Sequence, residues 1–65
     1  MSSSLPTWGI RPHTTGHVRA RDGSLLRVDV IAGRWVATRF RRDLVITHSV
    51  VGTDESVHQQ IARWL

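Results

Sequence analysis

The chain has 65 residues, enough for one domain with a marginal core, because a domain of this size buries only about 60% of its unfolded surface. It has no cysteine, which excludes disulfides and zinc sites that use thiolate ligands. All nine basic residues are arginine and the net charge is +4, which favours an anionic partner, since guanidinium groups bind phosphate and carboxylate bidentately. Arginine in place of lysine is equally typical of a GC-rich genome.

The N-terminal part predicts an irregular arm at residues 1–16, ahead of a single domain at residues 17–65. Pro6 and Pro12 lack backbone donors and favour extended geometry in the residues before them. The first residues lack the basic stretch and apolar run of a signal peptide, and no apolar run approaches the ~20 residues that span a membrane. We therefore expect a cytoplasmic protein without a membrane segment.

The middle of the chain has the composition of β-strands. Valine, isoleucine, threonine and aromatic residues dominate residues 17–51, and turn residues interrupt them, as in consecutive short strands. The predicted strands span residues 17–21, 25–31, 35–41 and 44–51.

The register of these strands depends on loop length, because a one-residue slip turns every side chain to the other face of a sheet. We chose the loop lengths that place apolar residues opposite one another. This criterion favours three-residue loops, at residues 21–23, 32–34 and 41–43. The cross-strand pairs that follow are Val18–Leu26, Val30–Val36 and Phe40–Leu44.

These registers predict a sheet with two unlike faces. The apolar face holds Val18, Ala20, Leu26, Val28, Val30, Val36, Phe40, Leu44, Ile46 and Val50. The basic face, which also carries an indole, holds His17, Arg19, Arg27, Asp29, Ile31, Trp35, Ala37 and Arg39, with Arg41 at its rim. The apolar face requires a lid.

The residues after the last strand predict a helix that supplies this lid. Thr53 can cap it, and Asp54 and Glu55 would lie at the positive end of its dipole. Apolar residues then recur at helical spacing, at Val57, Ile61, Trp64 and Leu65. The predicted fold is α+β, a small antiparallel β-meander of three to four strands covered on one face by a C-terminal α-helix.

No catalytic or metal-binding constellation is predicted, and we expect no enzyme and no cofactor. A zinc site made of histidine alone would need ligands from distant elements, and His58 is expected to pair with Asp54 one helical turn earlier. Asp29, in mid-strand, is expected to neutralise Arg27 or Arg39 across the sheet. The chain has no phosphate-binding glycine loop and no nucleophile motif.

The basic face predicts a nucleic-acid-binding module, because such surfaces combine cations for phosphates with rings for base stacking. The residues assigned to this role are Arg19, Arg27, Arg34, Trp35, Arg39, Arg41 and Arg42. The architecture is similar to that of the arm-binding domains of phage-type integrases, which lay a three-stranded sheet in the major groove, although no motif is shared. The alternative is a solvated sheet face whose charge prevents aggregation.

A second hypothesis is a protein-interaction module, as an adaptor, an inhibitor of a larger acidic partner or the subunit of a homo-oligomer, with a phage or mobile element as one conceivable source. The chain has three tryptophans, and tryptophan and arginine are enriched at binding hot spots. The residues assigned to partner binding are Trp8, Trp64 and Leu65. The alternative is that Trp8 and Trp64 only complete the small core.

Overall fold

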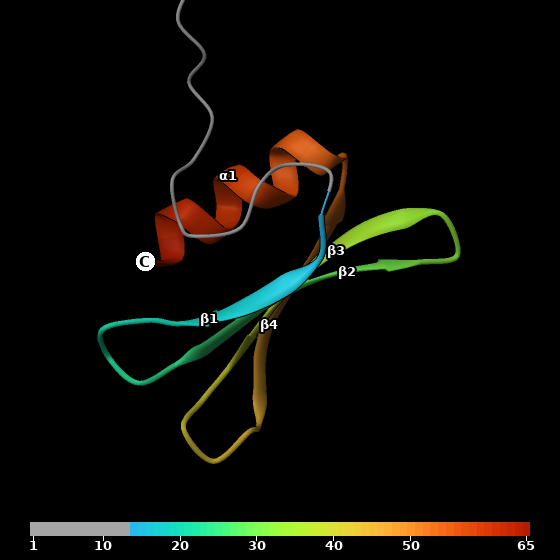
Figure 1. Ribbon diagram of the computed structural model, residues 1–65. Coiled ribbons are helices and arrows are strands. Elements are labelled where there is room, and N and C mark those ends of the chain that lie inside the picture. Colours follow the sequence, from blue (N-terminus) through green and yellow to red (C-terminus); the bar gives the residue numbers. More distant parts are fainter. Residues whose placement is uncertain (1–13) are drawn as a thin grey trace, which may run out of the picture.

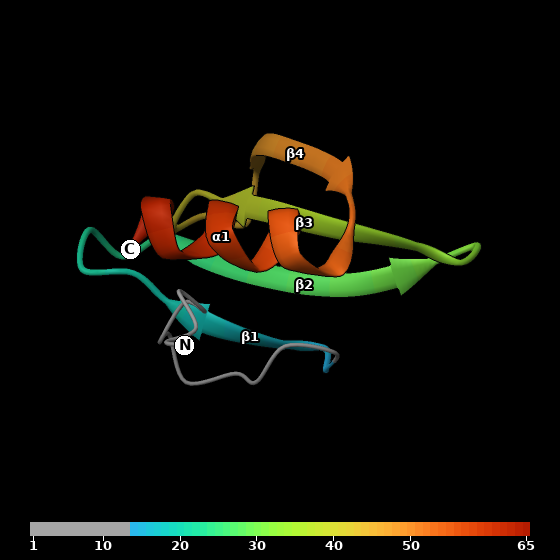
Figure 2. The same cartoon turned by 90° about the horizontal axis from the view of Figure 1, so that it is seen from above.

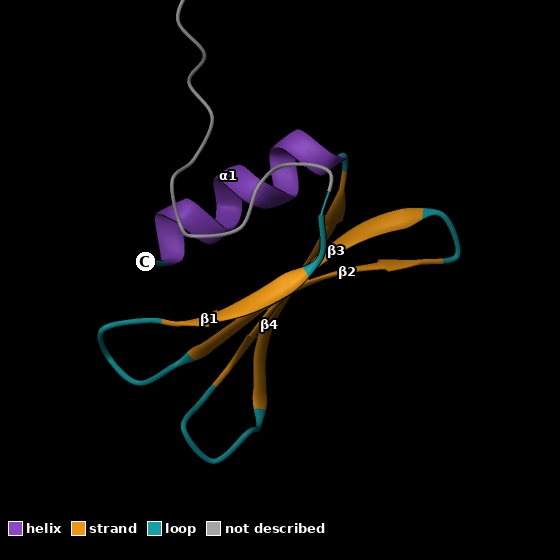
Figure 3. Ribbon diagram, viewed as in Figure 1, coloured by secondary structure: helices purple, strands orange, loops and turns teal. Residues whose placement is uncertain are grey.

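The computed structural model describes residues 14–65, so the predicted arm up to residue 13, with Trp8, lies outside the described residues. Its elements in chain order are β1 (Gly16–Arg19), β2 (Leu25–Ile31), β3 (Arg34–Phe40), β4 (Ile46–Gly52) and α1 (Asp54–Trp64). The strands form one antiparallel sheet in the order β1-β2-β3-β4, and α1 lies across one face of it (Figure 1, Figure 3). The predicted meander with a C-terminal helix is confirmed.

The turn between β1 and β2 is the three-residue loop that the sequence predicts. Val18 pairs with Leu26, the amide of Gly23 donates to the carbonyl of Ala20 at 3.0 Å, and the amide of Ala20 donates to the carbonyl of Ser24 at 2.8 Å. Gly23 has a φ of +90°, which glycine adopts without steric cost because it has no Cβ. The predicted register of this hairpin is correct.

The turn between β2 and β3 is one residue shorter than predicted. Val30 pairs with Trp35 and not with Val36, so the loop consists of Ala32 and Gly33 alone. Their φ angles are +52° and +76°, as in a type I′ turn, whose twist matches that of the flanking strands. Because side chains alternate along a strand, this difference turns every side chain of β3 to the face opposite the predicted one.

The turn between β3 and β4 has the predicted length but begins one residue later. The amide of Leu44 donates to the carbonyl of Arg41 at 2.8 Å, and the amide of Arg41 donates to the carbonyl of Val45 at 2.8 Å. Phe40 consequently pairs with Ile46, so the predicted pairing with Leu44 is wrong. Leu44 has a φ of +67°, in the loop position that glycine fills in the first hairpin. A bulge then shifts the register before the rest of β4.

Replacing Ala32 with asparagine should stabilise the protein. Asparagine tolerates the left-handed backbone better than alanine, and Asn-Gly is a preferred type I′ pair. Because residue 32 is exposed, we expect the free energy of unfolding, measured by urea titration, to rise by about 0.5–1 kcal/mol. Ala32→Val should lower it, because a β-branched side chain is strained at positive φ. A gain with valine and none with asparagine would contradict the two-residue loop.

The core lies between α1 and the face of the sheet that α1 covers (Figure 2). Its buried apolar residues are Ala20, Leu26, Val28, Ala37, Val57 and Ile61. Partly buried residues close its edges, at Val18, Trp35, Val50 and Trp64. Within residues 14–65 the structure contains no helix with the length and apolar character needed to cross a bilayer.

The covered face carries different β3 residues from those predicted. Ala37 is fully buried in the core cluster, whereas Val36 and Phe40 belong to the opposite face, because they pair with Asp29 and Leu25 and paired residues share a face. The small side chain of Ala37 leaves room for the helix to approach the sheet. Val36, Phe40 and Ile46 are therefore wrongly assigned to the core by the sequence criterion, whereas Val28 and Val50 are correctly assigned.

The start of α1 agrees with the prediction. Thr53 is the N-cap, and its Oγ1 accepts a hydrogen bond from the amide of Ser56 at 3.1 Å. Asp54 and Glu55 lie in the first turn, where carboxylates are favourable. The capping residue and the acidic first turn thus fix where the helix begins.

Candidate interaction surfaces

The predicted arginine–tryptophan face is not assembled in this structure. Trp35 lies on the covered face, packs against the core and has its ring centroid 5.6 Å from that of His58. Arg39 shares this face because it pairs with the buried Leu26, whereas Arg27, one position along β2, lies on the other. The short β2–β3 turn is the cause, and it separates the two arginines that were expected to act together.

The face of the sheet that α1 leaves uncovered, which we call the open face, mixes apolar and polar residues. Its apolar residues are Leu25, Ile31, Val36, Phe40, Ile46 and Val51, and its polar and charged residues are His17, Arg19, Arg27, Asp29, Arg34, Thr38 and Ser49. Ile31 and Ile46 are each 60% exposed and Val51 is 55% exposed. The apolar residues form two groups on either side of a polar row at Arg27, Thr38 and Ser49.

The tip of the β3–β4 hairpin adds to this apolar surface. Leu44, Val45 and Ile46 are consecutive and all are exposed, and the hairpin projects away from α1 (Figure 1). Isolated exposed apolar residues are common, but contiguous groups of them mark interaction sites.

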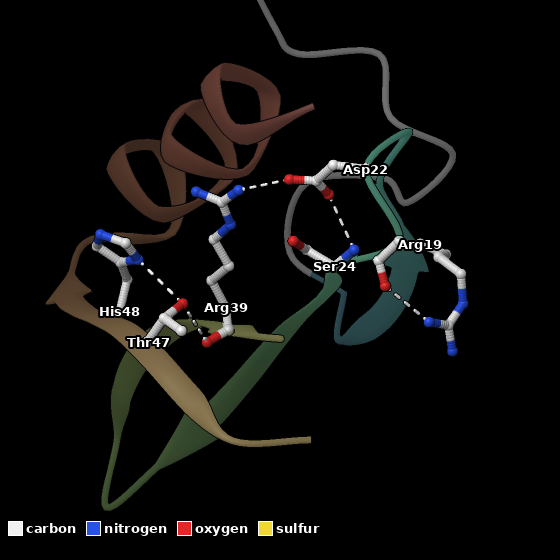
Figure 4. Close-up of polar contacts among 7 residues, drawn as sticks. Arg19, Asp22, Ser24, Arg39, Thr47 and His48 are labelled. Carbon is white, nitrogen blue, oxygen red and sulfur yellow. Dashed lines mark hydrogen bonds and ion pairs between the residues drawn. The ribbon is translucent and has the colours of Figure 1, made fainter. Parts of the chain in front are cut away.

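Three of the six arginines assigned to nucleic acid are neutralised within the chain. Arg27 Nε lies 2.8 Å from Asp29 Oδ2, so Asp29 neutralises one of the two expected arginines, but along β2 and not across the sheet. Arg39 Nη2 instead lies 2.7 Å from Asp22 Oδ2 (Figure 4). The Arg41–Asp43 pair is 2.8 Å long.

These contacts set the pKa values of the two turn carboxylates. The amide of Ser24 donates to Asp22 Oδ1 at 2.9 Å and, with the Arg39 contact, lowers the pKa of Asp22. The hydrogen bond from Arg41 lowers the pKa of Asp43 and raises that of Arg41. Both carboxylates therefore favour the ionised form that binds arginine.

Most of the assigned arginines lie at one end of the sheet. The β1–β2 and β3–β4 loops share this end, and around them lie Arg19, Arg21, Arg39, Arg41 and Arg42. Arg34 begins β3 at the opposite end. The sequence predicts these arginines on one face of the sheet, whereas the structure groups most of them at one end of it.

His58 is a residue whose environment the sequence reasoning missed. It is fully buried, its Nδ1 lies 2.8 Å from Asp54 Oδ1, and the predicted pairing with Asp54 is confirmed. His58 precedes Ile61 by three positions, so the two share one helical face. This spacing was the available signal for its burial.

The residues assigned to partner binding at the C-terminus partly serve the domain itself. Trp64 packs against the core, with its ring centroid 5.8 Å from that of His48. The amide of Leu65 donates to the carbonyl of Ile61 at 3.1 Å and so caps α1, while its side chain remains exposed. Trp8 lies outside the described residues.

Comparison with known proteins finds no matching family model, no matching curated protein and no matching solved structure. Within residues 14–65, no three histidine, aspartate or glutamate side chains are grouped so that they could hold a metal ion. Functional assignment therefore rests on the geometry of this chain.

Proposed function

We propose that the protein is a protein-interaction module whose open face binds a second copy of the same chain. The observation that carries this proposal is the exposure of Ile31, Ile46 and Val51, each more than half accessible on a face that the helix leaves uncovered. Antiparallel sheets normally present polar residues on a face left to water. The proposal assigns no catalytic role and keeps the cytoplasmic location expected from the sequence.

The charges of the open face favour a second copy over an unrelated partner. Arg27 and Asp29 lie together on β2, with Nε and Oδ2 2.8 Å apart. A two-fold axis that lies in the interface, crosses the strands and passes near Val28 places Arg27 of each copy opposite Asp29 of the other. Contacts are reciprocal across such an axis, so one residue pair supplies two intersubunit ion pairs.

The same axis also brings apolar groups together. It reverses the strand direction between the copies, so Ile31 at one end of β2 faces Leu25 at the other end in the second copy. The face is therefore self-complementary at the Arg27–Asp29 and Ile31–Leu25 contacts.

The size of the domain supports self-association. Among residues 14–65, the buried apolar core holds six residues, two of them alanine, and single chains shorter than about 70–80 residues rarely gain enough stability from such a core alone. Three strands of seven residues and one of four make a face of at most roughly 19 by 23 Å. That face, extended by the exposed hairpin tip, provides an interface of the size found in weak, transient complexes.

The experiment is sedimentation velocity across a micromolar concentration series. We expect a concentration-dependent dimer for the native chain and a monomer with unchanged circular dichroism for Val51→Asp. Leu65→Asp, which places the same charge on an exposed residue of the helix end, is the matched control and should remain dimeric. A native chain that stays monomeric up to about 100 µM would refute the proposal.

A charge-swap series tests the geometry of the dimer. Arg27→Asp alone sets two carboxylates against each other and should weaken the dimer about tenfold or more. Adding Asp29→Arg restores opposite charges across the axis and should recover most of the lost affinity. A double variant as weak as the single one would show that another partner or another geometry occupies the face.

A further inference from the structure

Three guanidinium groups converge on the β1–β2 turn. Arg19 Nη1 donates to the carbonyl of Gly23 at 2.9 Å, and Arg39 Nη2 reaches Asp22 Oδ2 at 2.7 Å from the other side (Figure 4). Arg42 reaches over from the β3–β4 loop, and its guanidinium occupies the space that a Cβ on Gly23 would take. Two separate loops thus bring three cations to one turn.

The turn neutralises only one of these three cations, Arg39. Asp22 is its only carboxylate, and both oxygens are already engaged, Oδ1 by the amide of Ser24 at 2.9 Å and Oδ2 by Arg39 at 2.7 Å. Among residues 14–65, Arg19 and Arg42 form no salt bridge of their own. Exposed Arg21 adds a further positive charge in the same loop.

We propose that this turn binds phosphate groups of a nucleic-acid backbone. A planar guanidinium presents donors in a fork that matches two phosphate oxygens. Arg19, Arg21 and Arg42 place positive charge around the two loops at this end of the sheet beyond the charge that Asp22 and Asp43 neutralise, which favours a polyanion over a single free phosphate.

The residues of this site that are tested lie outside the proposed dimer contact, although Arg19 pairs with Leu25 at the border of the open face. Arg42 lies in a loop and Arg39 on the covered face, so neither takes part in the packing of open faces. Loss of nucleic-acid binding without loss of the dimer, or the reverse, therefore distinguishes the two proposals.

The experiment measures the fluorescence anisotropy of the full chain with labelled single-stranded DNA, duplex DNA and RNA, at 50 and 200 mM salt. We expect binding that weakens steeply with salt, because each neutralised phosphate releases counterions. Arg42→Gln should weaken binding about fivefold and reduce the slope of log affinity against log salt by about one. Arg34→Gln, which removes the same charge at the opposite end of the sheet, should weaken binding less than twofold.

Two outcomes would overturn the inference, provided that circular dichroism shows each variant to be folded. The first is absence of oligonucleotide binding by the native chain at 50 mM salt. The second is an equal loss in Arg42→Gln and Arg34→Gln, which would mean that net charge and not this turn attracts the ligand. Labelled polyglutamate is included as a probe, and tighter binding to it than to every oligonucleotide would assign the turn to acidic protein instead.

Discussion

Ile61→Ala should lower the free energy of unfolding by about 3 kcal/mol. Ile61 is fully buried, and it joins α1 to the sheet within the core cluster. Its truncation removes the transfer free energy of three carbon atoms and leaves a cavity that a tightly packed core closes only in part. Since a domain of this size has only a few kcal/mol of stability, the variant should be largely unfolded at 37 °C when followed by circular dichroism.

Ile46→Ala is the matched control, because it makes the same chemical change on the other side of the sheet. Ile46 is exposed on the open face, so at concentrations below dimerisation its truncation should cost less than about 1 kcal/mol. Equal losses of stability for the two variants would contradict this fold, because they would indicate that α1 packs on the face of the sheet that carries Ile46.

His58→Ala is the second substitution with a large expected effect, also about 3 kcal/mol. The imidazole is fully buried and its Nδ1 lies 2.8 Å from Asp54 Oδ1. Its ring is tilted by 60° relative to the Trp35 indole, with the ring centroids 5.6 Å apart. Its removal opens a cavity and takes a hydrogen-bonding partner from a carboxylate whose side chain is only 15% exposed. Urea unfolding monitored by tryptophan fluorescence measures the change.

A double-mutant cycle with Asp54→Ala separates the cavity from the interaction. If the His58–Asp54 contact stabilises the helix start, the double variant should lose at least about 1 kcal/mol less than the sum of the two single losses. Additive losses would show that His58 acts only by filling volume.

The secondary structure followed from the sequence because local signals determine it. The Thr53 cap, the acidic first turn and the four-residue spacing of Val57 and Ile61 placed the helix correctly. Gly23 likewise marked the one loop position in its hairpin that requires a positive φ. These signals act within a few residues, so they need no tertiary information.

The orientation of β3 was missed because this strand is apolar on both faces. The hydrophobic criterion favoured pairing Val30 with Val36, but the observed pairing with Trp35 is equally apolar, so this criterion does not determine the register. The deciding feature is the type I′ turn, in which Ala32 takes a positive φ, a position that asparagine or glycine would have signalled but alanine does not. The same applies to the third turn, where Leu44 takes a positive φ that a leucine does not signal in the sequence.

The arginine cluster depended on this tertiary arrangement. Arg39 meets Asp22 across an intervening strand, and Arg42 meets Gly23 from another loop, so neither contact has a local signature. Once the sequence criterion assigned Arg39 to the open face, it could not bring these residues together. Because the β2–β3 loop was predicted one residue too long, the arginine site was expected on a face of the sheet, whereas the structure places it at one end of the sheet.

The most direct test is a nuclear Overhauser spectrum of the labelled protein that reports which β3 side chains contact α1. We expect cross-peaks from the Trp35 indole to the His58 ring, whose centroids are 5.6 Å apart, and from the Ala37 methyl to the core residues of α1. Cross-peaks from Val36 and Phe40 to Val57 or Ile61, without those from Trp35, would contradict the arrangement of the sheet and with it the open face.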